Sequence, residues 1–378
     1  MTLLLDQAQI ADPISHYRSF QRQRSVYFDP LSQSFALFRY ADCRAVLAAE
    51  QAQVATLAND ERRRQLPERL VMLIDSLVRV SNPPHHGPLR EMTGRLMESL
   101  SSLEDGGPEE LLDRLLVGHR GDRLDWNLFA RQLMPQMLLQ SVGMAEAARQ
   151  RVIELLPTLV RLMLPQKRSD DWQQIDRALV SIQQRLLRLP LFEVTTDIEP
   201  ERRVMAFIGL LIQSFDAGRG LLCHALRRAL LSDAEQIGSG FVQEVLRFDS
   251  PIQLTRRTLA AELQLPVGDD EPGATAECVG TLPAGTKLVL ILAIANRDAE
   301  QFANPDIFQP GRSNSDSHLT FGVGGHSCLA RHYGVALTVR IINLLLARYP
   351  SMRLLEQPLA MEPLVNARLP RQLPIRLG

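Results

Sequence analysis

The most informative stretch of this sequence is Phe321-Gly322-Val323-Gly324-Gly325-His326-Ser327-Cys328. It directly precedes a strongly apolar segment, 334–347, whose spacing predicts a helix. Three glycines in four positions let the backbone turn tightly and approach a flat ligand closely. A cysteine just before a helix feels the positive end of the helix dipole, which favours the metal-binding thiolate. A lone cysteine in such a loop is the kind of ligand that an iron centre needs.

Two other ligands for this loop agree less well with the sequence. A zinc site needs several companions at short spacing, and Cys43, Cys223 and Cys278 are all far from Cys328 in the sequence. A dinucleotide-binding fingerprint needs another glycine at the position of Ser327, and the lysine of a phosphate-binding loop is also missing. From the residues alone, a purely structural cysteine stays open as the alternative to an iron ligand.

The composition is that of an ordinary globular protein. Its 378 residues are 45% hydrophobic and 22% charged, and 42 basic against 43 acidic residues give a formal net charge of −1. Nothing in this balance calls for a nucleic-acid partner. The chain shows neither the pattern of a signal peptide nor an uncharged apolar run of membrane-spanning length, so we expect no membrane association. Four cysteines do not suggest a disulfide framework, and a reducing cytoplasm fits best.

Apolar residues spaced by threes and fours predict helices over most of the first 250 residues. The predicted helices are 41–49, 87–100, 109–117, 124–142, 145–164, 172–189 and 201–231. Strand patterns are fewer: 26–27 with 35–38 predicts a hairpin, and a larger β region is predicted within 252–294, with a surface loop at 268–280. The expected fold class is therefore mainly α, with a large helical body and a smaller β-rich portion near 26–40 and 252–294.

Several further motifs follow one another along the chain. They are Asp12-Pro13, Tyr40-Ala41-Asp42, Asn82-Pro83-Pro84-His85-His86 with Arg90, Glu244-Val245-Leu246-Arg247, Asn296-Arg297-Asp298 with Asn304-Pro305-Asp306-Ile307-Phe308 and Arg312, and Leu373-Pro374-Ile375. Together with the cysteine loop, this series resembles the cytochrome P-450 superfamily, the heme-thiolate monooxygenases, in its soluble bacterial members. The resemblance extends over nearly the whole chain and implies a single domain, 1–378, with the cytochrome P-450 fold.

The resemblance also implies a heme site. It assigns Cys328 as the proximal thiolate ligand to the iron of heme b (iron protoporphyrin IX). The other residues that it assigns to the cofactor are His86, Arg90, Arg257, Phe321, Gly322 and His326, with the histidines and arginines neutralising the propionates. Arg256 is the alternative to its neighbour. Glu244, Arg247 and Arg312 are expected to form a buried charge network that braces the loop, although a glutamate and an arginine three apart on a helix are more often an exposed pair.

The sequence departs from the family in the long helix predicted over 201–231. Family members carry there an acid followed by a threonine, which deliver protons to bound oxygen. The resemblance places these catalytic positions at Asp216 and Gly218, but no threonine occurs between residues 198 and 255. Either a substrate hydroxyl or water takes this role, or peroxide is the oxidant, or the reaction is not oxygen insertion. Ser214 offers a hydroxyl one turn earlier, although a serine within a helix more often bonds its own backbone.

The resemblance therefore implies a heme-thiolate oxidoreductase, a cytochrome P-450-type monooxygenase that oxidises a small organic substrate, free or bound to a carrier protein, in specialised metabolism. Electrons would come from NAD(P)H through a ferredoxin and a ferredoxin reductase in the cytoplasm. One alternative is an atypical heme-thiolate enzyme that uses peroxide or catalyses coupling, desaturation or rearrangement. A second alternative is a catalytically idle heme protein that recruits or senses. Substrate contacts are expected from 55–80, 189–196, 209–217, 252–254 and 364–366.

Overall fold

The computed structural model describes residues 2–22, 26–58, 60–100, 107–117, 121–164, 167–193, 198–266 and 280–378. The chain divides into two compact units. Unit 1 consists of Met1–Ala55, Gly121–Asn127 and Gly220–Gly378. Unit 2 consists of Thr56–Arg120 and Leu128–Arg219. The expectation of a single domain over 1–378 stays a prediction.

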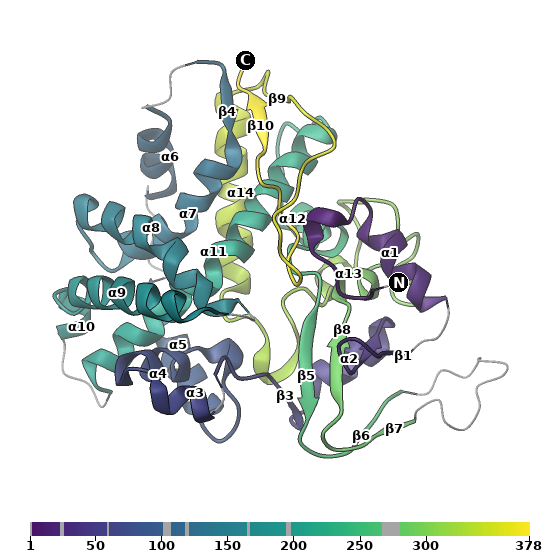
Figure 1. The fold of residues 1–378 in the computed structure, drawn as a ribbon. Helices are drawn as coiled ribbons and strands as arrows, with labels where there is room; N and C mark the ends of the chain where they lie inside the picture. The colour runs from purple at the N-terminus through teal and green to yellow at the C-terminus, as the bar shows by residue number, and fades with distance from the viewer. Residues whose placement is uncertain are drawn as a thin grey trace. The chain divides into compact units, whose positions relative to one another are not determined.

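The main sheet of unit 1 joins segments that are far apart in the sequence (Figure 1). Within the described residues, its strands in spatial order are β1 (Val26–Asp29), β2 (Ser34–Leu37), β8 (Lys287–Leu290), β5 (Thr255–Leu259) and β3 (Ala52–Gln53). β1 and β2 form an antiparallel hairpin, β2 pairs with β8 in parallel, and β5 pairs antiparallel with β8 and with β3. The predicted hairpin and the predicted β region are therefore confirmed, and they belong to one sheet.

Both faces of this sheet are covered, because successive side chains of a strand point to opposite sides. On β8, Leu288 and Leu290 pack into an apolar cluster with residues of α2 (Tyr40–Ala48). Val289, between them, packs into a second cluster with residues of α1 (Pro13–Gln21). The helix predicted over 41–49 is thus confirmed as α2, and α1 is a helix that the apolar spacing does not reveal.

A second sheet of unit 1 lies outside the β portion expected from the sequence. Its described strands in spatial order are β4 (Arg123–Asp125), β10 (Pro374–Arg376) and β9 (Arg353–Leu354). The helix predicted over 124–142 is therefore wrong in its first two residues, because α7 spans Trp126–Ser141. The reason is a partner 248 residues away: the backbone N–H of Leu373 donates to the carboxylate of Asp125 at 2.8 Å. A pattern read along 124–142 contains no sign of that partner.

A third, short pairing joins β6 (Leu263–Gln264) to β7 (Thr281–Leu282). The chain turns between β7 and β8, where Gly285 has a φ of +82° and the backbone N–H of Thr286 donates to the Pro283 carbonyl at 3.3 Å. The surface loop predicted at 268–280 lies, apart from its last residue, outside the described residues.

Three helices of unit 1 flank the segment that carries the cysteine loop. They are α12 (Ser239–Phe248), α13 (Leu292–Ala295) and α14 (Arg331–Arg348). α12 packs against α14, and the helix predicted over 334–347 is confirmed as α14. The apolar spacing places Val335, Val339 and Ile342 on one face of this helix, and of these Val335 and Ile342 are buried and Val339 is half-buried.

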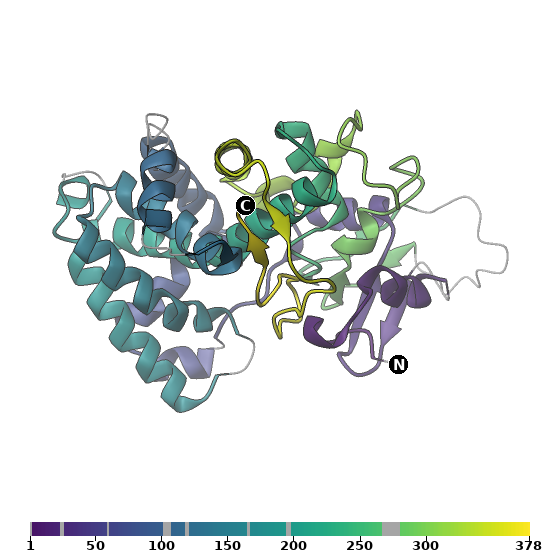
Figure 2. The same ribbon diagram turned by 90° about the horizontal axis from the view of Figure 1, so that it is seen from above.

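Unit 2 is helical in the part that the structure describes (Figures 1 and 2). Its elements are α3 (Asp60–Gln65), α4 (Glu68–Asp75), η2 (Val78–Val80), α5 (His86–Leu100), α6 (Gly107–Val117), α7 from residue 128 onward, α8 (Glu146–Val160), η3 (Arg161–Met163), α9 (Ser169–Leu186), α10 (Pro190–Glu193) and α11 (Pro200–Leu231) as far as residue 219. α8 and α9 pack along each other. The helices predicted in this region are confirmed, with bounds that differ by up to four residues.

The first residue of α9 differs clearly from the prediction, because the helix begins three residues before the predicted start at 172. The carboxylate of Asp171 accepts a hydrogen bond from the backbone N–H of Arg168 at 2.8 Å, and this contact caps the helix at an earlier residue than its first apolar side chain. The apolar pattern marks where a helix packs, whereas its polar cap decides where it begins.

Within the described residues, two helical segments are long and apolar enough to cross a membrane by length and composition alone. In Pro200–Leu231, 72% of the most apolar window is buried, as in the core helix of a globular protein. In Gly324–Arg348 the corresponding share is 39%. The expectation that the protein has no membrane association stays a prediction.

Candidate functional site

The cysteine loop folds back on itself through two backbone hydrogen bonds. The N–H of Gly322 donates to the Leu319 carbonyl at 2.8 Å, and the N–H of Cys328 donates to the Phe321 carbonyl at 2.7 Å. Gly322 has a φ of +67° and Gly324 a φ of +69°, a left-handed conformation that glycine adopts without strain. This closed loop leaves the side chain of Cys328 exposed, whereas Cys43 and Cys223 are buried.

Gly324 also allows the loop to approach α2 closely. A Cβ atom at this position would lie 3.1 Å from the Leu47 carbonyl oxygen and 3.1 Å from the Cα of Ala48. Both of these are backbone atoms of unit 1 that cannot move aside as the end of a flexible side chain can. The glycine is therefore required twice, by its backbone conformation and by the space available.

The donor groups around the loop fit a heme iron. Among the described residues, no three histidine, cysteine or acidic side chains gather as a chelating group. A heme iron would need only one ligand from the protein, because the porphyrin supplies its other donors. Cys328 offers an exposed sulfur for this purpose, and His326 lies two residues before it in η5 (Gly324–His326). The ring of Phe321 is half-buried between the ring of His318, at 5.3 Å, and the guanidinium of Arg331, at 5.7 Å.

The expected charge network is present and lies beside α12. Glu244 and Arg247 are fully buried, and two N–H groups of Arg247 donate to the two carboxylate oxygens at 2.8 Å each. The other donors of this guanidinium reach the backbone carbonyls of Asn296 and Pro305, both at 2.9 Å, and of Ile307 at 3.2 Å. All five N–H groups of the arginine are satisfied, which is the condition for a buried ion pair to be tolerated.

Arg312 completes this network from the chain that follows α13. Its Nε lies 3.4 Å from a carboxylate oxygen of Glu244, and it donates to the carbonyls of Ala303 and Asn304. The backbone N–H of Gln309 donates to the same carboxylate at 2.8 Å. The network therefore ties the segment between 303 and 312 to α12, as the sequence predicts.

The structure distinguishes Arg257 from its neighbour. Arg257 is buried on β5, where its Nη1 donates to the hydroxyl of Thr255 at 3.0 Å and to the carbonyl of Arg256 at 2.7 Å. Arg256 is exposed, because adjacent residues of a strand point to opposite faces. The two arginines are therefore not interchangeable, and only Arg257 presents a buried guanidinium.

His86 and Arg90 belong to unit 2 and lie one turn apart on α5, as predicted. The imidazole of His86 is buried, and its Nδ1 lies 2.9 Å from the hydroxyl of Ser81. Arg90 is half-buried. The spacing places both side chains on one face of the helix.

Asp216 and Gly218 lie on α11, where the structure adds a residue that the sequence analysis misses. The carboxylate of Asp216 forms an ion pair with Arg219 at 2.9 Å, and the arginine is the more buried partner, at 7% side-chain exposure against 28%. The spacing of three residues between opposite charges was the available signal. At Gly218, a Cβ atom would lie 3.2 Å from the end of the Met134 side chain, so this glycine allows α7 to pack closely.

A half-exposed stripe at helical spacing runs along the middle of α11, beside the half-exposed Asp216 and Gly218. Its members are Leu210, Gln213, Ser214 and Ala217. The hydroxyl of Ser214 donates to the carbonyl of Leu211 at 3.3 Å, so it bonds its own helix. The side chain of Gln213 accepts the backbone N–H of Arg79 at 3.1 Å. The structure thus brings two of the ranges expected to contact substrate, 55–80 and 209–217, against each other within unit 2.

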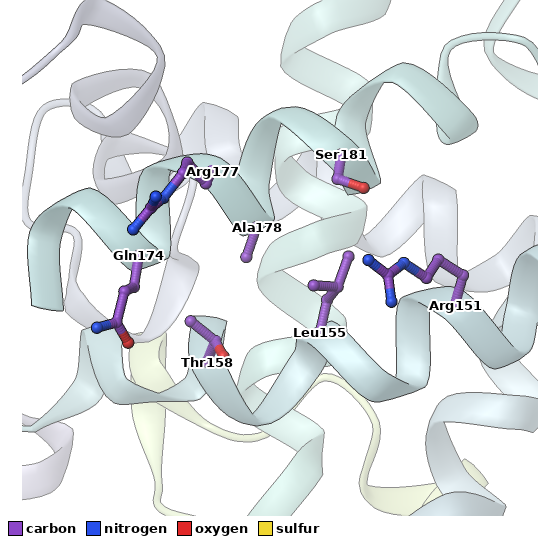
Figure 3. Close-up of a pocket in the computed structure, with 7 residues that line it drawn as sticks. All are labelled: Arg151, Leu155, Thr158, Gln174, Arg177, Ala178 and Ser181. Atoms are coloured by element: carbon purple, nitrogen blue, oxygen red, sulfur yellow. The ribbon is translucent and has the colours of Figure 1, made fainter.

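A groove of about 310 Å³ lies elsewhere in unit 2, between α8 and α9 (Figure 3). Figure 3 shows side chains of the two helices on its opposite walls, with polar and apolar groups mixed. The lining residues are Arg151, Leu155, Thr158, Gln174, Arg177, Ala178 and Ser181. None of the site residues expected from the sequence lines this groove, so it is separate from the chemistry that the cysteine loop indicates.

Comparison with known proteins identifies relatives for this chain. A family model described as Cytochrome P450 matches residues 239–347. The biotin biosynthesis cytochrome P450 of Bacillus subtilis (strain 168) is 34% identical over 146 residues, which cover 39% of this chain and 33% of that protein. The beta-dihydromenaquinone-9 omega-hydroxylase of Mycobacterium bovis is 24% identical over 373 residues, which cover 89% of this chain and 71% of that protein. Several curated relatives are thus matched over only 33–34% of their own length.

Solved structures show the similarity of the whole fold. The crystal structure of P450BioI in complex with an acyl carrier protein that bears hexadec-9Z-enoic acid has a TM-score of 0.79 at 22% identity, covering 97% of this chain and 98% of that one. The crystal structure of CalO2 has a TM-score of 0.80 at 20% identity, covering 100% of this chain and 99% of that one. The predicted fold class, a mainly helical P450 fold with a smaller β portion, is confirmed.

Proposed function

Because this chain belongs to the cytochrome P450 superfamily, we propose that it is a heme-thiolate oxidoreductase in which the sulfur of Cys328 binds the heme iron. The observation that carries the proposal is the closed glycine loop, which exposes the sulfur of Cys328 directly before the N-terminus of α14. Bound heme would supply the oxidising centre, and a thiolate ligand supplies the electron density that favours O–O cleavage.

The residues of this chain would hold the sulfur in place. The carbonyl of Phe321 accepts the N–H of Cys328 at 2.7 Å, and Gly322 and Gly324 give the backbone its left-handed turns. The positive end of the α14 dipole stabilises a thiolate at Cys328.

Four cationic or ionisable side chains are proposed to bind the heme propionates. In unit 1 these are Arg257 and His326, and in unit 2 they are His86 and Arg90. A buried guanidinium such as that of Arg257 suits a carboxylate, because it keeps its charge and donates several hydrogen bonds in one plane. Phe321 and Gly322 are proposed to belong to the same cofactor-binding loop.

Proton delivery is the unusual part of the proposed mechanism. Asp216 and Gly218 are proposed as the catalytic positions of α11, a helix that contains no threonine. The carboxylate of Asp216 accepts from Arg219, and Ala217 beside it has no hydroxyl. A proton relay built on this face must then use an ordered water or a hydroxyl of the substrate.

The same observation favours a second candidate function. An enzyme of this fold without a threonine hydroxyl on α11 is suited to oxidation by peroxide, or to coupling, desaturation or rearrangement. These reactions differ from oxygen insertion in the protons that the protein must deliver. The hydroxyl of Ser214 bonds the carbonyl of Leu211, so it does not supply the missing group. A heme protein that only recruits or senses is the third candidate.

Substrate and partners are proposed more broadly. We propose a small organic substrate in specialised metabolism, and the P450BioI complex with a fatty acid on an acyl carrier protein supports a substrate that is bound to a carrier. Electrons are proposed to come from NAD(P)H through a ferredoxin and its reductase in the cytoplasm, since many members of the family use such partners.

The decisive experiment is a carbon-monoxide difference spectrum of the reduced, heme-loaded protein. Wild type is expected to show the band of a thiolate-ligated heme, and Cys328→Ser is expected to lose it. Cys223→Ser is the matched control, because Cys223 is buried and lies on α11. A thiolate band that persists in Cys328→Ser would contradict the ligand assignment.

Turnover assays then separate the candidate functions. Product formed with ferredoxin, reductase, NADPH and dioxygen supports the monooxygenase. Product formed only with peroxide supports the second candidate, and an intact heme spectrum without turnover supports the third.

A further inference from the structure

We propose that Asn296 and Thr320 are positioning residues for the thiolate ligand. Together they anchor residues 318–320, the stem of the loop that ends at Cys328. This inference rests on the proposed heme-thiolate function and assigns a role to two residues outside the loop's own motif. Neither side chain is expected to touch heme. Their role is to keep the carbonyl of Phe321 in the place where it accepts the N–H of Cys328.

Thr320 stands at the centre of a small hydrogen-bond cluster. Its hydroxyl donates to the carbonyl of Leu246 in α12 at 2.8 Å, lies 2.8 Å from the hydroxyl of Ser250, and accepts from the side-chain amide of Asn296 at 3.0 Å. One hydroxyl can donate once and accept twice, so Thr320 can serve all three contacts when the hydroxyl of Ser250 donates to it; the other acceptor available to Ser250 is the carbonyl of Ile252 at 2.7 Å. The residue just before Phe321 is therefore bonded to both α12 and the end of α13.

Asn296 holds the same stem from its other side. Its side-chain carbonyl accepts the backbone N–H of Leu319 at 2.8 Å, while its amide donates to Thr320. The side chain of Asn296 is fully buried, so water does not compete for these contacts. Two consecutive residues of the stem are thus clamped by one amide group.

The clamp is connected to the charge network. The backbone carbonyl of Asn296 accepts from Arg247 at 2.9 Å, and Arg247 is held by both carboxylate oxygens of Glu244. A continuous path therefore leads from the ion pair through Asn296 to the stem, and from Phe321 to Cys328. The charge network can fix the position of the sulfur only through the hydrogen bonds of Asn296 and Thr320. Loss of these hydrogen bonds should therefore alter the ligation of the heme iron by Cys328.

The experiment compares three single variants of the heme-loaded protein. Thr320→Val removes the hydroxyl at nearly constant volume, and Thr320→Ser restores it without the methyl group. Thr286→Val is the control, because Thr286 is buried and its hydroxyl donates to a nearby backbone carbonyl, that of Pro283, at 2.7 Å, away from the stem. For each protein we would measure the reduced carbon-monoxide spectrum, the reduction potential, the unfolding midpoint, and amide hydrogen exchange at Leu319 and Cys328.

In Thr320→Val, the buried side-chain amide of Asn296 loses the hydroxyl that accepts its hydrogen bond, and the ratio of heme without the thiolate ligand to thiolate-ligated heme is expected to rise by about tenfold. Exchange at Leu319 and Cys328 is expected to accelerate by a similar factor. Thr320→Ser should return both values close to wild type. Thr286→Val should lower the unfolding midpoint without changing the spectrum or the exchange of the loop.

A purely structural role would give a different pattern. If Thr320→Val lowered the unfolding midpoint as Thr286→Val does but kept the thiolate spectrum and the slow exchange, the inference would be overturned. This result is distinct from failure of the proposed function, which Cys328→Ser tests on its own. A thiolate band lost in Cys328→Ser but unchanged in Thr320→Val would refute the clamp and leave the ligand in place.

Discussion

The stem of the Cys328 loop is held by polar side chains from several elements, whereas the middle of α11 is held mainly by apolar packing. Around the stem, Glu244, Arg247 and Asn296 are fully buried and their polar atoms meet defined partners. In the middle of α11, buried residues such as Leu211 and Phe215 are apolar, and the first buried charge after the stripe is that of Arg219. Buried polar contacts demand particular residues in particular places, while apolar packing accepts many residues of similar volume. The stem region therefore shows the residue pattern of the family, whereas the middle of α11 can lack the family's threonine and still pack.

The largest effect expected from this comparison is at the ion pair. Glu244→Gln leaves Arg247 as a buried charge without its counterion, and the free energy of unfolding is expected to fall by about 3–5 kcal/mol. Denaturant unfolding at neutral pH measures this change. The control is Glu154→Gln, which breaks an exposed pair with Arg151 at the same spacing and is expected to cost less than about 1 kcal/mol. Equal small losses in both variants would show that burial of the pair contributes nothing.

A second test compares one glycine from each region. Gly324→Ala forces a left-handed conformation on alanine and brings its Cβ against the backbone of α2, so we expect a loss of about 2–4 kcal/mol. Gly218→Ala has no left-handed backbone to strain, meets the side chain of Met134 at 3.2–3.4 Å rather than backbone atoms, and gains helix propensity, so its change is expected within about 1 kcal/mol. Unfolding curves of both variants give the comparison. A larger loss for Gly218→Ala would reverse our account of which glycine is required.

A third test uses pH, because the stem region contains a buried imidazole. His318 is buried, and burial, together with the charges of Arg331 and Arg247, lowers its pKa to about 3. Its Nδ1 accepts the N–H of Thr320, so the ring proton is on Nε2, 3.0 Å from the side-chain oxygen of Gln243. The neutral ring of His318 therefore contributes a hydrogen bond to Thr320 within the stem.

The sign follows from this lowered pKa. The unfolded chain binds a proton near pH 6.5 and the folded chain does not, so the stabilisation is complete above pH 6.5 and is lost as the pH falls toward 3. At pH 5 we expect a loss of about 2 kcal/mol from this residue. The measurement is the difference in unfolding free energy between pH 7 and pH 5 for wild type and His318→Gln. Identical pH dependence in the two proteins would rule out a titrating role for this histidine.

The smallest effect is expected at Ser214. Its hydroxyl bonds the carbonyl of Leu211, so Ser214→Ala should change substrate turnover by about twofold or less. Steady-state assays with the functional oxidant measure this, with unfolding curves as a check on folding. A drop on the order of tenfold or more would place Ser214 in the proton relay.

The sequence was sufficient for the region with fixed contacts. The glycine loop and Cys328 were identified by residue type and spacing, the network of Glu244, Arg247 and Arg312 was implied by the family resemblance, and the network is confirmed in the structure. These positions are recognisable because each contact needs one particular chemical group. The assignment of Cys328 as a ligand stays a prediction until its spectrum is measured.

Other features could not be read from the chain. The ion pair of Asp216 with Arg219 is a common helical spacing that is usually exposed, so only its observed burial makes it notable. β4 is recognisable only through its pairing with β10 near the other end of the chain. Whether Arg256 or Arg257 is the buried one depends on the register of β5, which the local pattern does not decide.

The order of residues alone predicts the mainly helical fold class, the resemblance to a family and one cysteine as a candidate ligand, because these depend on motifs whose spacing is local. Folding in three dimensions adds what no local spacing contains. It determines that Asn296 and Thr320 clamp the stem of the loop, and that the hydroxyl of Ser214 turns back to its own helix. The physical reason is that a hydrogen bond requires its partner at about 3 Å, and chain segments far apart in sequence reach that distance only in the folded protein.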